Sequence, residues 1–172
     1  MAGGKGMDRE RIRFIEKYGR TEAEAAACSA YVRQHWKEEL GHRVRIADEI
    51  TRKFFVFDLP WDLEQTVEPV IFEGEIDWTY QPSDDPEFIY QMNRHRYWVC
   101  LGQAYAVTGK ERYAQCFADQ LTDWIRKNPL TEETKPVTWR TIRSRAGMAL
   151  NYTVTSTWLK PSHWAKHALR LC

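Results

Sequence analysis

The stretch NRHRYWVCLGQAYAVTGKERYA, residues 93–114, decides the fold that the sequence predicts. Its apolar residues continue a helix that begins with Asp85 as N-cap and Pro86 in the first turn, and Gly109 ends that helix. The next helix has apolar residues at helical spacing for four turns: Tyr113, Phe117, Leu121, Trp124 and Ile125. The sequence therefore predicts two antiparallel helices over residues 86–127, joined by a short turn.

Three further helices are predicted upstream of this pair. The first spans residues 8–18. The second begins with a capping box formed by Thr21 and Glu24 and ends near Gly41, and a short helix over residues 43–52 follows. The second helix has an apolar stripe of four residues: Ala25, Cys28, Val32 and Trp36.

The segment between these helices and the pair has a different character. Its Phe, Val and Ile clusters are interrupted by prolines, which favours extended segments near residues 54–58 and 70–73 over a helix. After the pair, a polar loop over residues 130–137 leads to a further helix from Thr138. The predicted fold class is all-α, with antiparallel helical hairpins and a short extended segment around residues 54–78.

Composition and charge bear on the class of partner. The chain has 25 basic and 24 acidic residues, a net charge of +1, so whole-molecule charge predicts neither a nucleic-acid partner nor a membrane partner. No apolar run approaches the ~20 residues of a membrane span, and the N-terminus lacks an apolar signal core, so we expect a cytoplasmic protein as written. The cysteines show neither CxxC nor zinc-site spacing, which predicts free thiols and no metal or cofactor: Cys28, Cys100, Cys116 and Cys172.

Asn93, Arg94 and His95 form a polar row among aromatic residues. Three consecutive helical residues spread over more than half of the helix circumference, so at least one of them points away from the solvent face. The row could be a solvent face, a buried hydrogen-bonding cluster or part of a polar binding site. Tyr97 and Trp98 are predicted to pack in the core. Aromatic residues make up 13% of the chain, which fits either a ring-rich core or flat rings that stack on sugars.

Three sequence blocks resemble the N-terminal part of the heparinase II/III-like polysaccharide lyases, most closely their heparin-sulfate lyase branch. The resemblance covers about residues 40–142, and it defines residues 1–142 as a partial helical domain of that kind. The blocks are FDLPWDLEQ with EPVIFEGEIDW (57–78), NRHRYWVCLGQAYAVTGKERYA (93–114), and LTDWIRKNP with VTWRTI (121–142).

The resemblance implies part of an incomplete α/α toroid, which in this family is usually followed by a β-sandwich. It implies β-elimination on acidic glycosaminoglycans such as heparan sulfate, in proteins that are often periplasmic or secreted. No residue here matches the family's catalytic acid and base, so we expect substrate binding without catalysis. Asn93, Arg94 and His95 would line the cleft, with Trp139 and Arg140 nearby.

A scaffolding role is the alternative for the polar row. Arg94 would then pair with Asp77 or Glu75, while Asn93 and His95 would tie the helix start to the aromatic loop.

The C-terminal segment, residues 143–172, departs from the family. No Asp or Glu follows Glu133, and Arg143-Ser144-Arg145 stands where the family tends to have an acidic-small-Gly run. We expect a frameshifted or truncated gene to explain this divergent basic segment. The alternative function is a non-enzymatic helical module that binds a protein or an anionic polymer through this segment.

Overall fold

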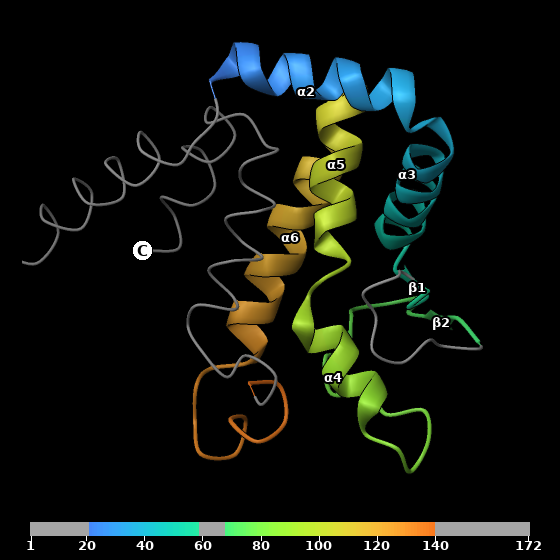
Figure 1. Cartoon of the computed structure of the whole chain (residues 1–172). Coiled ribbons are helices and arrows are strands. Elements are labelled where there is room, and N and C mark those ends of the chain that lie inside the picture. The colour runs from blue at the N-terminus through green and yellow to red at the C-terminus, as the bar shows by residue number, and fades with distance from the viewer. Residues whose placement is uncertain (1–20, 59–67, 140–172) are drawn as a thin grey trace, which may run out of the picture.

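The computed structural model describes residues 21–58 and 68–139, and helices make up most of this part of the chain (Figure 1). The only sheet among these residues has two short strands. In chain order the elements are α2 (Glu22–His35), α3 (Lys37–Thr51), β1 (Phe54–Phe55), β2 (Val70–Ile71), α4 (Glu87–Arg94), α5 (Trp98–Thr108) and α6 (Glu111–Lys127).

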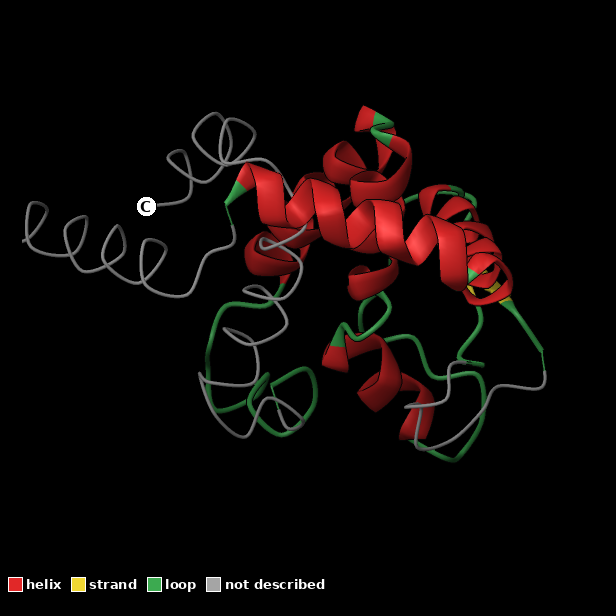
Figure 2. Ribbon diagram, turned by 45° about the horizontal axis from the view of Figure 1, so that its top comes forward, coloured by secondary structure: helices red, strands yellow, loops and turns green. Residues whose placement is uncertain are grey.

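Helices α3, α5 and α6 pack against one another and enclose most of the core (Figure 1). Helix α2 crosses the end of α5, as both views show (Figure 2), and Arg33 Nη1 donates to the carbonyl of Val107 in the last turn of α5 at 3.0 Å. Helix α4 lies at the opposite end of α5. Within the described ranges, none of these helices is long and apolar enough to span a bilayer.

The antiparallel pair predicted around residue 109 is present as α5 and α6. Gly109 has φ 67°, a left-handed conformation that glycine adopts without strain, and it ends α5 as predicted. The apolar face of α6 is buried at Tyr113, Phe117 and Trp124, each at most 1% exposed. Ile125, which the periodicity placed on the same face, is 42% exposed.

The single helix predicted from residue 86 to Gly109 is wrong, because it is interrupted between α4 and α5. His95 has φ 54°, in the left-handed region that His tolerates better than most residues. The Asn93 side chain donates to the carbonyl of Ile89, a hydrogen bond by which such side chains compete with regular helix bonding. The start is also later by one residue: the helix begins at Glu87, whose backbone N–H donates to Asp85 Oδ1 at 2.9 Å.

The helix boundaries upstream also differ from the prediction. The capping box of Thr21 and Glu24 is confirmed, but the chain turns at Trp36, and Gly41 lies inside α3. Trp36, predicted as part of an apolar stripe, is 52% exposed at this corner. The turn allows α3 to run alongside α5 and to bury its own apolar residues: Ile46, Ala47 and Ile50. The helix predicted over residues 8–18 lies outside the described residues.

The extended segments are confirmed as two short antiparallel strands. Phe54 pairs with Ile71, and Phe55 pairs with Val70. Phe55 is buried against the ring of Tyr97, in an edge-to-face contact with centroids 5.3 Å apart. The loop predicted over residues 130–137 is a series of turns, and the helix predicted beyond it falls mainly on residues outside the described part.

The cysteines that the structure describes are free thiols. Cys100 is buried, whereas Cys28 and Cys116 are partly buried. Burial, with a smaller contribution from the nearby Asp119, raises the pKa of Cys116 to about 12, so this thiol stays protonated at neutral pH.

The core position of Phe117 can be tested by truncation. Its ring is 1% exposed and meets Trp98 edge to face at 5.3 Å, so Phe117→Ala is expected to lower the free energy of unfolding by about 3–5 kcal/mol. Ile125→Ala, on the same helix but 42% exposed, is the matched control and should cost less than about 1 kcal/mol. Chemical denaturation measures both, and a loss below about 0.5 kcal/mol for Phe117→Ala would exclude that ring from the core.

Candidate functional site

Asn93 connects three separate parts of the chain at a fully buried point. Its Nδ2 group donates to the carbonyl of Trp78 at 2.9 Å and to the carbonyl of Ile89 at 2.8 Å. Its Oδ1 atom accepts a hydrogen bond from Trp124 Nε1 at 2.7 Å. Both amide hydrogens are therefore used inside the protein, and the side chain is 0% exposed. Asn93 holds α4, the loop before it and α6 together.

His95 lies at the helix interruption, inside an aromatic cluster formed by Trp78, His95, Trp98 and Trp124. Its imidazole stacks on Trp98 with centroids 3.9 Å apart and planes 6° apart, and it meets Trp124 edge-on at 4.9 Å. The residue is 1% exposed, and its Nε2 atom has no hydrogen-bond partner among the described residues. Burial lowers the pKa of His95 to about 3, so the ring is neutral at physiological pH.

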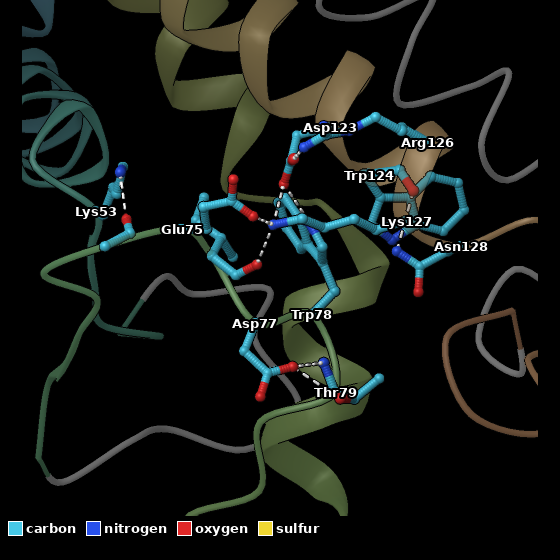
Figure 3. Close-up of polar contacts among 12 residues, drawn as sticks. Lys53, Glu75, Asp77, Trp78, Thr79, Asp123, Trp124, Arg126, Lys127 and Asn128 are labelled. Carbon is cyan, nitrogen blue, oxygen red and sulfur yellow. Dashed lines mark hydrogen bonds and ion pairs between the residues drawn. The ribbon is translucent and has the colours of Figure 1, made fainter.

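The loop that carries Trp78 is attached to the end of α6 by a polar network (Figure 3). Trp78 Nε1 donates to Asp123 Oδ2 at 2.9 Å. Lys127 Nζ lies 2.9 Å from Glu75 Oε2 and 3.1 Å from Asp123 Oδ2, and it donates to the carbonyl of Ile76 at 3.0 Å. Three oxygen atoms thus converge on one ammonium group, which fixes the loop to the helix.

Asp123 is ionised within this network. Burial alone would raise the pKa of its carboxyl group, but hydrogen bonds from Arg126, Trp78 and Lys127 outweigh burial and hold the pKa below its usual value. Its negative charge is therefore available to both cations at the end of α6.

Trp139 reaches the same region from the far end of the described chain. Its ring lies 4.8 Å from that of Trp124, and its Nε1 donates to the carbonyl of Asn128 at 3.0 Å. The structure therefore brings together three of the predicted site residues, because Asn93, His95 and Trp139 all contact Trp124. Arg140 lies outside the described residues.

Arg94 lies at the edge of this region and not inside it. Its guanidinium group pairs with Glu87 on the same helix, and the two side chains are 16% and 19% exposed. The pairing proposed in the scaffolding alternative, with Asp77 or Glu75, is not found. Asp77 instead accepts hydrogen bonds from Thr79, and Glu75 pairs with Lys127.

Sequence reasoning missed the roles of Trp78 and Trp124 at this site. The helical spacing of Trp124 correctly predicts its burial but does not reveal its hydrogen bond to Asn93. The available signal is chemical: a buried indole N–H normally has an acceptor, and the amide oxygen of Asn93 can supply one. Tyr97 and Trp98 are core residues as predicted, each 2% exposed.

Most of the chain matches a known protein family. Residues 13–169 match the model of the family described as heparinase II/III N-terminus. The chain belongs to this family. The match continues beyond residue 142, and the boundary expected there stays a prediction.

Individual relatives match shorter stretches. A heparin-sulfate lyase of Bacteroides stercoris is 44% identical over 61 residues, which are 36% of this chain and 9% of that protein. A heparin-sulfate lyase of Pedobacter heparinus is 35% identical over 68 residues, which are 38% of this chain and 10% of that protein. These matches therefore span only a small part of the relatives' length.

The fold also has a counterpart among solved structures. The crystal structure of a mutant of heparan sulfate lyase HepC from Pedobacter heparinus gives a TM-score of 0.61 at 20% identity, over 94% of this chain and 28% of that one. At 20% identity, this similarity is evidence for a shared fold only. The predicted class, an all-α arrangement belonging to a heparinase-type helical toroid, is confirmed.

The buried neutral imidazole predicts a dependence of stability on pH. Below about pH 6.5 the unfolded chain binds a proton at His95 that the folded chain, with a pKa of about 3, does not bind. The contribution of His95 to the free energy of unfolding is complete above pH ~6.5. As the pH falls below this value, the contribution is lost at a slope approaching about 1.4 kcal/mol per pH unit. Urea denaturation at intervals between about pH 7 and 5 measures the slope.

His95→Asn is the control for this measurement, because Asn also tolerates the left-handed conformation but does not titrate. The free energy of unfolding of this variant should lack the steep dependence on pH over the same interval. Equal slopes for both proteins would show that His95 is not buried in its neutral form.

Proposed function

We propose that this chain is the helical, saccharide-binding part of a polysaccharide lyase that acts by β-elimination on acidic glycosaminoglycans such as heparan sulfate. The observation that carries the proposal is the family match over residues 13–169, together with 44% identity to a heparin-sulfate lyase over 61 residues. An acidic polysaccharide is the partner that these relatives suggest. On this proposal the chain binds the polymer and does not cleave it alone.

In this proposal the predicted site residues have different tasks. Arg94 contacts the polysaccharide, because a guanidinium group can bind both oxygens of a carboxylate or sulfate and this one is partly exposed. Trp139 supplies a flat indole that suits a sugar ring, and Arg140 supplies a second guanidinium group for the anionic groups of the polymer. Asn93 and His95 are positioning residues, since both are at most 1% exposed and hold Trp124 and the helix interruption in place.

The properties of His95 and Tyr97 support binding without catalysis. β-Elimination needs a base that removes a proton and an acid that protonates the leaving oxygen, each with a pKa near the operating pH. The pKa of His95 is lowered by burial to about 3, whereas burial and then the nearby Cys116 raise the pKa of Tyr97 well above its usual value. Both side chains are at most 2% exposed, so neither reaches a sugar carbon.

Substitution of Arg94 tests the binding role. Arg94→Gln is expected to weaken binding of a heparan sulfate hexasaccharide about tenfold or more, because charge-assisted hydrogen bonds to the ligand are lost. Arg45→Gln is the matched control: Arg45 also pairs with a glutamate on its own helix, Glu49, but lies on α3. Isothermal titration calorimetry measures both affinities, and equal affinities would contradict the proposed site.

The same experiment separates the alternative function. If the basic segment binds the polymer, replacing Lys160, Lys166 and Arg170 with glutamine should abolish binding while Arg94→Gln leaves it unchanged. That result would replace the proposed site with an interaction surface in residues 143–172.

The absence of catalysis is a separate prediction. The chain incubated with heparin or heparan sulfate is expected to release no unsaturated uronate, since His95 and Tyr97 are buried and cannot act as the required acid-base pair. Absorbance at about 232 nm follows the conjugated product. A steady increase that His95→Ala abolishes would identify the chain as a complete lyase.

A further inference from the structure

We propose that Glu87 is a specificity-determining residue, which occupies the guanidinium group of Arg94 until a sufficiently acidic saccharide displaces it. The proposal rests on the function proposed above and adds a residue to it. Its basis is the Glu87–Arg94 ion pair on α4.

The pair is arranged along one face of α4. Residues 87 and 94 are two helical turns apart, so both side chains lie on the same face. Phe88, Met92 and Asn93 are buried. Glu87 and Arg94, at 19% and 16% exposure, are neither buried nor fully solvated. Both side chains are therefore partly accessible to solvent and to a dissolved anion.

Both ends of the pair are held in place by neighbouring contacts. The backbone N–H of Glu87 donates to Asp85 Oδ1 at 2.9 Å, which fixes the first turn of the helix. At the other end, the buried hydrogen bonds of Asn93 fix the backbone next to Arg94. The glutamate is therefore presented to the guanidinium group by the fold and does not depend on a chance approach of two long side chains.

This arrangement makes binding an exchange of anions. A carboxylate or sulfate that approaches Arg94 competes with the carboxylate of Glu87 for the guanidinium group. An ion pair removed partly from water is stronger than one on the open surface, so this competition affects the affinity. A neutral sugar offers no charge in exchange and leaves the pair intact. A saccharide with closely spaced anionic groups can displace Glu87 and hold the guanidinium group through more than one oxygen. The pair therefore favours highly charged polymers over weakly charged ones.

Removing the charge of Glu87 without changing its shape tests this role. Glu87→Gln is expected to tighten binding of a heparan sulfate hexasaccharide roughly three- to tenfold, because the carboxylate of Glu87 no longer competes with the ligand. Glu49→Gln is the matched control, since it also removes the carboxylate of an Arg–Glu pair on one helix, and it should change the affinity less than about twofold. Glu87→Asp, which keeps the charge on a shorter side chain, should lie between the wild type and Glu87→Gln.

A double-mutant cycle shows whether the effect passes through Arg94. In an Arg94→Gln background, Glu87→Gln should change the affinity no more than Glu49→Gln does, because there is no guanidinium group to release. An equal gain in both backgrounds, or a gain no larger than that of the control, would overturn the role of Glu87 and leave the proposed function standing. If neither the wild type nor any variant binds the hexasaccharide better than neutral cellohexaose in calorimetry, the proposed function fails, and the role of Glu87 fails with it.

Discussion

The carboxamide of Asn93 is the interaction on which the rest of the site depends. It is fully buried and joins the loop at Trp78, the helix at Ile89 and the indole of Trp124. A buried amide that lost one of these partners would leave donors or acceptors unsatisfied, at a cost of about 1–3 kcal/mol for each group. With Asn93 in place, α4 ends nearby, His95 enters the aromatic cluster and Trp124 faces Trp139. One side chain therefore positions elements that are distant in sequence.

The sequence predicted those features that depend on local chemistry. The hairpin of α5 and α6 follows from helical periodicity and from Gly109, and the start of α2 follows from the capping box of Thr21 with Glu24. The interruption at His95 could not be found in this way, because the apolar spacing continues through it. It coincides with hydrogen bonds that join Asn93 to residues 15 and 31 positions away, and no local pattern records such contacts.

The single residues of the candidate site show the same difference between what local sequence predicts and what distant contacts decide. The sequence identified Asn93, Arg94 and His95 as unusual because three consecutive polar residues cannot all face solvent on one helix. The structure gives each a different environment: hydrogen bonds for Asn93, ring stacking for His95 and an ion pair for Arg94. The partner of Arg94 was not predictable, since Glu75, Asp77 and Glu87 all precede it and only the fold decides which carboxylate is within reach.

The hydrogen bonds of Asn93 also determine which positions can change independently in evolution. Two of its three partners are backbone carbonyls, those of Trp78 and Ile89, which any amino acid at those positions supplies. The third is the indole nitrogen of Trp124, which no other side chain provides at that place. Position 93 is therefore coupled through hydrogen bonding to residue identity at position 124 alone. Substitution at positions 78 and 89 is limited by the packing of their side chains and not by their hydrogen bonds to Asn93.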